Sequence, residues 1–171
     1  MSAPLLRTER TILLPLSTAD LDEVGALYAD PAVMEYVDGG VRTRDQTKSA
    51  LAANERCWRA EGWGLWSIRE AETGALIGES GLQRLFDVEG ATVDFGFTLT
   101  RRFWRDGYAT EAGHAILLDL WDRFPGDLVH AVAHPENTGS EATLHKLGFR
   151  LAEERLVHGQ TMNLWEIQRT R

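Results

Sequence analysis

The sequence contains a single cysteine, Cys57, among its 171 residues. One thiol cannot form an intrachain disulfide and cannot supply the clustered thiolates of a structural zinc site. A disulfide-held scaffold is therefore excluded, and we expect the fold to depend on a hydrophobic core. A chain of this length buries roughly 70% of its unfolded surface when it folds.

Long hydrophobic runs are also missing. No stretch approaches the 18 or so consecutive apolar residues that a membrane-spanning helix requires. The first ten residues, MSAPLLRTER, have no apolar segment of the kind found in secretory signals. These absences predict a cytoplasmic protein that does not engage a membrane.

Basic charge is scarce, because 18 Lys and Arg face 26 Asp and Glu and leave a net charge of −8. Broad binding to nucleic acid needs a basic face, so we expect no nucleic-acid partner. An acidic surface would attract a basic substrate, although an acidic excess more often serves only solubility.

Standard phosphate and metal motifs are absent as well. There is no G-x-x-x-x-G-K-[ST] sequence, and Gly62 and Gly64 lack the third glycine of a dinucleotide fingerprint. The histidines His114, His130 and His134 do not have metal-ligand spacing, so we expect no metal site. An unrelated nucleotide-binding domain is therefore the disfavoured alternative.

What is present is a regular succession of amphipathic segments. Period-two alternation and helical stripes predict a mixed α/β sheet in one domain over residues 1–171. Helix caps are expected at Ser17 with Asp20 or at Thr18 with Glu23, and a capping box at Thr138 and Glu141. The expected strands are 10–16, 64–71, 75–83, 91–99, 128–134, 149–157 and 161–169, and the expected helices are 17–29, a short turn at 31–37, 43–60, 107–123 and one opened by the second box.

The segment RRFWRDGYATEA, residues 101–112, joins the strand at 91–99 to the next helix. Gly107 lies at the helix start, where glycine allows a close backbone approach and the first N–H groups lack helical partners. Such a terminus suits a phosphate or pyrophosphate, and Arg101, Arg102 and Arg105 stand beside it. The alternative is a tight turn whose arginines are merely solvated.

The sequence WRDGYATEA resembles the R/Q-x-x-G-x-G/A coenzyme A loop of the GNAT N-acetyltransferase superfamily. More narrowly, it is similar to the W-G-Q-G-Y-A-T-E-A form of the Rim-type family, which acetylates ribosomal-protein N-termini. Further blocks resemble that family in the family's own order: LRTERTILLPLSTADLDEV, DPAVMEYV, GWGLWSI, ETGALIGESGL, VDFGFTL and HPENTGSEATLHKLGF.

Four positions depart from the family pattern. Arg105 replaces a glycine, Asp106 a glutamine and Leu14 an arginine. Leu144 occupies the position of a tyrosine that protonates the leaving thiolate in many GNAT enzymes, but this tyrosine is commonly missing in the Rim-type branch. The missing tyrosine and the altered loop leave open a non-catalytic, acyl-CoA-binding or regulatory module.

The resemblance implies a GNAT fold with a splayed, mostly antiparallel sheet flanked by helices, and acetyl-CoA as co-substrate without a metal. Pantetheine would lie between the strands at 91–99 and 128–134, with Gly96 marking a bulge or close approach. The coenzyme contacts would be the backbone of Phe97, Thr98 and Leu99, the loop residues Arg102, Arg105, Asp106, Gly107, Tyr108, Ala109 and Thr110, and the helix residues Asn137, Ser140 and His145.

The implied chemistry is direct acetyl transfer from the thioester to a primary amine, either a protein N-terminus or a small molecule. Asp94 or Glu79 would act as the base, although either could be a solvated strand charge. Ser140 is the best available hydroxyl for the thiolate, and a backbone N–H near Leu99 would bind the oxyanion.

The acceptor side is open in the sequence. Trp63, Trp66, Trp104 and Tyr36 could line an acceptor slot, although core positions are the commoner use of tryptophan. The acceptor's identity and the choice between monomer and homodimer are not fixed.

Overall fold

The computed structural model of the protein describes residues 4–85 and 90–170. Its described strands form one eight-stranded sheet with the order β1-β2-β3-β4-β5-β6-β8-β7. Neighbouring strands are antiparallel except β5 and β6, which confirms the mixed, mostly antiparallel sheet. The strands are β1 (Leu6–Arg7), β2 (Thr11–Pro15), β3 (Leu65–Glu70), β4 (Leu76–Arg84), β5 (Val93–Leu99), β6 (Leu128–Ala133), β7 (Arg150–Val157) and β8 (Gln160–Gln168).

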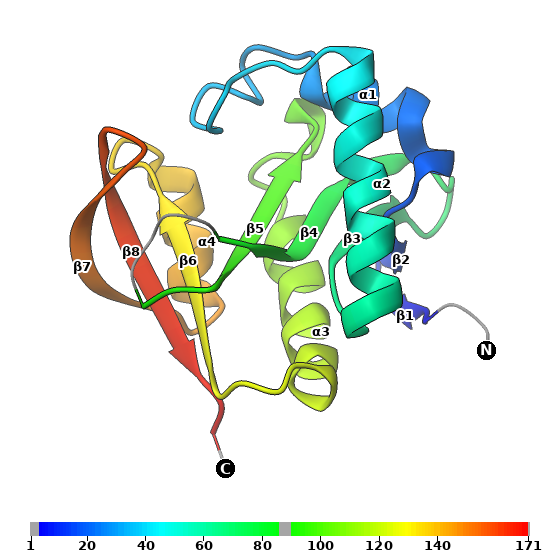
Figure 1. Ribbon diagram of the computed structural model, residues 1–171. Coiled ribbons are helices and arrows are strands. Elements are labelled where there is room, and N and C mark those ends of the chain that lie inside the picture. The colour runs from blue at the N-terminus through cyan, green and yellow to red at the C-terminus, as the bar shows by residue number, and fades with distance from the viewer. Residues whose placement is uncertain (1–3, 86–89, 171) are drawn as a thin grey trace.

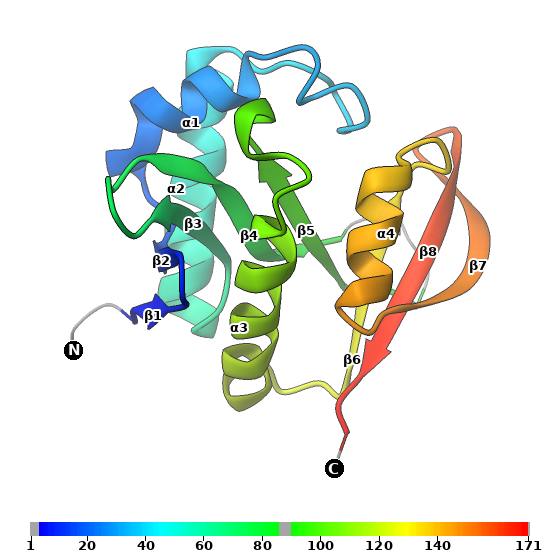
Figure 2. The same ribbon diagram turned by 180° about the vertical axis from the view of Figure 1, so that it is seen from behind.

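Helices cover both faces of the sheet (Figures 1 and 2). The helices α1 (Leu21–Tyr28) and α2 (Arg44–Glu61) lie over one face, and α3 (Tyr108–Arg123) and α4 (Thr138–Lys146) over the other. The main core packs Ile116 and Leu120 of α3 against sheet residues such as Phe95, and a second core lies beneath α1 and α2.

The sheet divides between β5 and β6. Their described register consists of one pair, Asp94 with His130, after which the two strands diverge toward their C-terminal ends (Figure 1). On the far side of the division β6, β8 and β7 form a separate antiparallel wing. The splayed pair of strands implied by the sequence resemblance is therefore present.

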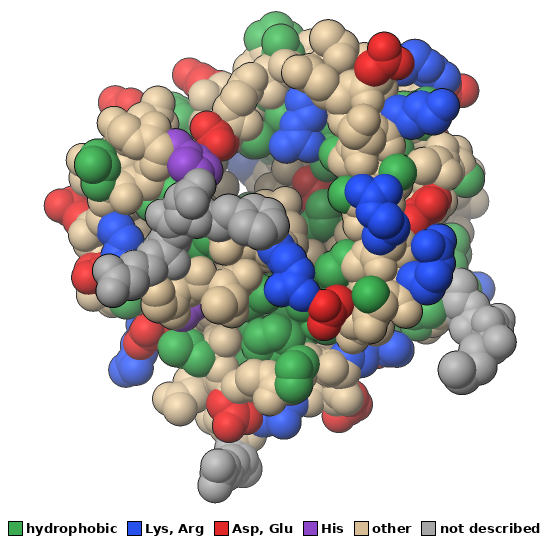
Figure 3. Space-filling view, in the orientation of Figure 1, with side chains coloured by type: hydrophobic (Ala, Val, Ile, Leu, Met, Phe, Trp, Pro, Cys, Tyr) green, Lys and Arg blue, Asp and Glu red, His purple; other side chains and the backbone are tan. Residues whose placement is uncertain are grey.

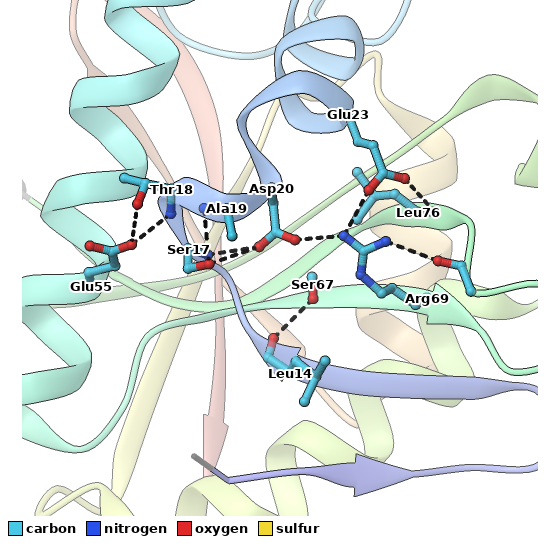
Figure 4. Close-up of polar contacts among 11 residues, drawn as sticks. Leu14, Ser17, Thr18, Ala19, Asp20, Glu23, Glu55, Ser67, Arg69 and Leu76 are labelled. Atoms are coloured by element: carbon cyan, nitrogen blue, oxygen red, sulfur yellow. Dashed lines mark hydrogen bonds and ion pairs between the residues drawn. The ribbon is translucent and has the colours of Figure 1, made fainter. Parts of the chain in front are cut away.

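The approach to α1 is fixed by hydrogen bonds to neighbouring elements (Figure 4). Ser17 and Asp20, the first of the two caps that the sequence allows, form a capping box at the start of the short 3-10 helix Thr18–Asp20. Arg69 on β3 donates to Asp20 and also pairs with Glu23 of α1. These contacts hold the first turn of α1 against the sheet and thereby fix the position of Tyr28 at its last turn.

Two local predictions have different outcomes. Residues 31–37 begin with a single helical turn, as expected, because the Met34 N–H donates to the Asp30 carbonyl at 3.1 Å, and Gly39 and Gly40 follow with positive φ angles of 80° and 64°. The β4–β5 register runs without interruption through Gly96, so this glycine does not mark a bulge.

The close backbone approaches occur instead on β4. A Cβ atom at Gly78 would lie 2.2 Å from the carbonyl oxygen of Thr98, and one at Gly81 would lie 2.3 Å from that of Gly64.

Candidate active site

A cavity of about 1830 Å³ lies where the sheet divides. Its walls include β4, β5 and β6, α2, the segment before α3, the start of α4 and residues 35–42. Figure 3 shows the molecule hollowed on the face that carries α1 and α2, with acidic and basic side chains around the opening.

The backbone of β5 turns alternate residues toward β4 and toward the cavity. Thr100 N–H donates to Ile77 at 2.9 Å and Leu85 N–H to Thr92 at 3.0 Å, so the even-numbered residues of β5 pair with β4. Phe97 and Leu99 therefore direct their N–H groups toward β6, beyond the point where the two strands separate. Thr98 differs, because its backbone pairs with Glu79 on β4.

The loop before α3 gives that helix an uncapped start. Gly107 is the N-cap residue with a φ of 81° and no side-chain cap. Ala109 and Thr110 are half-buried on the cavity wall, and Arg105 and Tyr108 also line it. Arg105 has a φ of 65°, a left-handed conformation that explains why the related loops have glycine there.

Two residues predicted for this loop are placed differently. Arg102 and Asp106 are exposed and are not part of the cavity wall. The carbonyl group of Asp106 instead accepts a hydrogen bond from Arg10 Nη1 at 2.9 Å.

Arg10 joins β2 to the loop from outside the cavity. Its Nε donates to Glu111 Oε2 at 2.7 Å, its backbone N–H donates to Glu111 Oε1 at 2.8 Å, and its guanidinium lies 4.2 Å from the centre of the Tyr108 ring. Thr8 adds a 2.6 Å bond to the same carboxylate. These donors lower the pKa of Glu111 against the opposing effect of burial.

The start of α4 lies across the cavity from this loop. Asn137 accepts from the Ser140 N–H at 3.2 Å and is the N-cap residue. The predicted capping box of Thr138 and Glu141 is therefore wrong, because the helix begins one residue earlier than the box requires. Asn137 and Ser140 line the cavity, whereas His145 is exposed on the last turn and does not.

Glu79 is the buried carboxyl group of the site, with 5% of its surface exposed. Tyr28 donates to its Oε1 at 3.3 Å, and its Oε2 has no hydrogen-bond partner among the described residues. Burial raises the pKa of Glu79 to about 7, although the nearby Thr98 hydroxyl, the positive charge of Arg42 and the Tyr28 hydrogen bond act to lower it. Burial and the neighbouring Glu79 raise the pKa of Tyr28 well above its ordinary value, so Tyr28 keeps its proton.

Asp94 fastens the two strands where they begin to diverge. Its Oδ1 accepts from the Val132 N–H at 2.9 Å and its Oδ2 from Gln83 at 2.9 Å. Burial raises the pKa of Asp94, while these two hydrogen bonds act to lower it. Both carboxylate oxygens thus already have partners.

The aromatic residues divide between core and cavity. Trp63 and Trp66 are buried in the main core, with 3% and 2% exposed, whereas Trp104 and Tyr36 line the cavity. Tyr36 stacks on His134 of the segment after β6, with 5.0 Å between ring centres. Leu144, at the position of the family tyrosine, is buried in the core.

Sequence reasoning missed Tyr28, Arg42 and Arg10. Tyr28 meets Glu79 across 51 positions of the chain and Arg10 meets Glu111 across 101, so no local motif announces either contact. The one available signal is the block LRTERTILLPLSTADLDEV of the family resemblance, which contains Arg10.

Neither a metal centre nor a membrane span was found in the described residues. No group of three or more His, Cys, Asp or Glu side chains there is placed to hold a metal ion. None of the helices in this part of the chain is long and apolar enough to cross a bilayer.

The family model described as "Acetyltransferase (GNAT) domain" matches residues 10–150. The Bacillus subtilis protein YkkB is 30% identical over 130 residues, which covers 75% of this chain and 74% of YkkB. The N-acetyltransferase p20 of Bacillus licheniformis is 27% identical over 152 residues and covers 85% and 82%. The chain is thus similar to proteins of one family over most of its length.

Solved structures share the same architecture. The acetyltransferase of Agrobacterium tumefaciens str. C58 superposes with a TM-score of 0.84 at 25% identity, over 99% of this chain and 96% of that one. RimL, the ribosomal L7/L12 acetyltransferase solved with coenzyme A, gives 0.81 at 14% identity over 96% and 98%. MccE, the microcin C7 self-immunity acetyltransferase solved with acetyl-CoA and AMP, gives 0.75 at 16% identity over 94% and 93%. At these last two identities the likeness is one of fold.

Proposed function

Because the chain belongs to the GNAT acetyltransferase family, and is an acetyltransferase, we propose that it transfers acetyl from acetyl-CoA to a primary amine at the division between β5 and β6. One observation carries the proposal. The buried carboxyl of Glu79 lies in the same cavity as Phe97 and Leu99, whose backbone N–H groups point away from β4. That arrangement combines a proton acceptor with donors for a polarised carbonyl.

The residues around the cavity fit coenzyme A. The N–H groups of Phe97 and Leu99 would bond to the pantetheine amides, as an added strand does. The uncapped start of α3 at Gly107 would receive the pyrophosphate, with Arg105, Tyr108, Ala109 and Thr110 around it. Asn137 and Ser140 would contact the coenzyme from α4, and RimL and MccE were solved with the same class of ligand. The coenzyme supplies an acetyl group activated as a thioester.

Glu79 is the better candidate for the base. Both oxygens of Asp94 already accept hydrogen bonds, whereas Oε2 of Glu79 has no partner in the described part of the chain. A pKa of about 7 lets Glu79 accept a proton near neutral pH, as a general base must.

The transfer step assigns a role to each remaining group. Glu79 takes a proton from the amine as its nitrogen bonds to the carbonyl carbon. The Leu99 N–H donates to the carbonyl oxygen, and the Ser140 hydroxyl donates a hydrogen bond to the sulfur, which leaves as a thiolate and takes its proton from solvent. A coenzyme thiol is a fair leaving group, so the Ser140 step contributes less than the Glu79 step.

Within the family we place the chain in the Rim-type branch on the strength of its WRDGYATEA loop. A ribosomal-protein N-terminus is one acceptor of this branch, as the name of RimL states for that protein. A cytoplasmic location and a monomer or homodimer stay predictions from the sequence.

The test is release of free thiol from acetyl-CoA in the presence of amine acceptors, together with calorimetry of coenzyme binding. We expect binding by the purified protein and thiol release with at least one amine. Coenzyme binding without thiol release from any acceptor would favour the non-catalytic acyl-CoA-binding module instead. Absence of any binding would overturn the proposal altogether.

A further inference from the structure

Three side chains on the α1 side of the cavity form a row that coenzyme binding does not explain. The Tyr28 hydroxyl donates to Glu79, and the Arg42 guanidinium lies 4.7 Å from the centre of the Tyr28 ring on its other side. The Arg42 N–H also donates to the Tyr28 carbonyl at 2.9 Å, which ties residue 42 to the end of α1. Tyr28 therefore holds a carboxyl group and a guanidinium at a fixed separation.

The carboxyl end of the row is built to accept one more hydrogen bond. Only 5% of the surface of Glu79 is exposed, yet its Oε2 has no hydrogen-bond partner among the described residues. A buried polar atom without a hydrogen bond carries an uncompensated desolvation cost. An acceptor amine with its N–H groups aimed at Oε2 would remove that cost.

The guanidinium end of the row is built to accept an anion. Arg42 is half-buried on the cavity wall, and its guanidinium forms no ion pair or hydrogen bond with any of the described residues. A guanidinium held flat against an aromatic ring keeps its edge available for bidentate binding of a carboxylate. Arg84, which also lines the cavity, differs because Glu61 already pairs with it.

We propose that the acceptor is a free amino acid, whose amine is received by Glu79 and whose carboxylate is received by Arg42. This inference rests on the proposed acetyl transfer and names its substrate class. Arg42 is then the residue that determines specificity, because it binds a group absent from simple amines and from most peptide N-termini.

The rim of the cavity does not conflict with this substrate. Glu35, Asp38 and Glu136 line it, but they are exposed and therefore screened by solvent and salt. A polyamine is the competing acceptor that such an acidic rim would favour. The half-buried position of Arg42 disfavours a polycation, because a second ammonium group would lie beside the guanidinium.

The first experiment compares acceptors that differ only in the carboxylate. Thiol release is measured with the common amino acids, with their carboxamides, with spermidine and with a ribosomal-protein N-terminal peptide. We expect at least one amino acid to be acetylated with kcat/KM at least tenfold above that of its carboxamide, as loss of a charge-assisted hydrogen bond predicts.

The second experiment assigns that preference to Arg42. Arg42→Gln should lower kcat/KM for the amino acid about tenfold more than for its carboxamide and leave the coenzyme Kd unchanged, because any change in the pKa of Glu79 affects both acceptors alike. Arg42→Lys should restore part of the preference, since it keeps the charge without the planar fork. Arg56→Gln, which removes another cavity arginine that is exposed on α2, serves as the matched control and should change neither acceptor.

The outcomes separate this inference from the proposed function. Acetylation of spermidine, the peptide or the carboxamides at rates equal to or above those of the amino acids would overturn the inference and leave amine acetylation standing. An equal loss of kcat/KM in Arg42→Gln for an amino acid and for its carboxamide would also overturn the inference. Coenzyme binding with no acceptor acetylated would overturn both.

Discussion

Glu79 is a carboxyl group held in a place where its charged form is poorly solvated, and this governs how the site should respond to pH. Burial raises its pKa to about 7, and the charged groups facing it are Arg42 and Asp94, with the protonated Tyr28. A base acts only when deprotonated, so the active fraction increases as pH rises through 7.

We expect kcat/KM to rise with pH through about 7 in the native protein. Glu79→Gln should lose that rise and be slower by about 100-fold at pH 7, the lower end of what general base catalysis contributes. The rise due to the acceptor amine's own ionisation, at higher pH, should remain. Glu136→Gln is the control, because it removes an exposed carboxylate from the cavity rim. An unaltered rise near pH 7 in Glu79→Gln would remove Glu79 from the mechanism.

The same carboxyl group should reduce stability above neutral pH. Its folded pKa is raised, so between the ordinary value of 4.5 and about 7 the folded state holds a proton that the unfolded state releases. Stability therefore falls as pH rises through this window. Glu79→Gln should be more stable than the native chain by up to about 3 kcal/mol at pH 8, and equally stable at pH 4. Denaturant unfolding at the two pH values measures this, and equal stability at pH 8 would contradict it.

Arg105 has a left-handed backbone conformation with a φ of 65°. A Cβ atom in that region costs about 1–2 kcal/mol, which glycine avoids. The free energy of unfolding of Arg105→Gly should therefore exceed that of Arg105→Ala by about 1 kcal/mol, as measured by denaturant unfolding. Both variants lack the guanidinium, so calorimetry should find their coenzyme affinities lowered to the same extent. If the two unfold together, the loop is not strained at residue 105.

At the scale of elements, the proposed coenzyme loop is held by a contact with the segment between β1 and β2. Arg10 donates to the Asp106 carbonyl and to Glu111, and it stacks on Tyr108, so it touches both sides of Gly107. Arg10 thus positions the proposed coenzyme loop although it does not itself line the cavity. Glu111, an acidic residue in the first turn of α3, accepts the hydrogen bonds of this contact.

Removing the Arg10 contact should weaken coenzyme binding selectively. Arg10→Gln is expected to raise the coenzyme Kd about tenfold while the acceptor KM at saturating coenzyme stays unchanged. Arg10→Lys should recover part of the affinity. Arg7→Gln, an exposed arginine on the neighbouring strand β1, is the matched control. A lower melting temperature with unchanged Kd would mean that Arg10 stabilises the fold without positioning the loop.

The elements with strong local patterns could be predicted from the sequence. The stripe of α3 and the alternation of β5 follow from which face each residue buries, and the Ser17 cap follows from chemistry within one turn. The start of α4 differs from the predicted one, because Asn137 and Thr138 are both good caps and the tertiary structure selects Asn137. The row of Glu79, Tyr28 and Arg42 could not be predicted, since it depends on how α1 is docked.

At the scale of the whole molecule, two wings of one sheet meet at a single described residue pair, Asp94 with His130. A ligand that bonds to β5 and to the start of α4 joins both wings and should stabilise the fold as a whole. At a free concentration one hundred times Kd, coenzyme adds about 2.7 kcal/mol to the free energy of unfolding. This added stability slows hydrogen exchange at every amide that exchanges only through global unfolding.

Hydrogen exchange can separate that general effect from binding between the wings. The Phe97 and Leu99 amides face the division beyond the described β5–β6 pair, whereas the Thr100 amide already bonds to Ile77. Coenzyme should therefore slow exchange at Phe97 and Leu99 by far more than at Thr100, because only the first two amides gain a hydrogen bond. Residue-resolved exchange by NMR, with and without coenzyme, measures the difference. Equal slowing at all three amides would mean that the coenzyme stabilises the fold without pairing to β5, and the cavity would then hold it in another way.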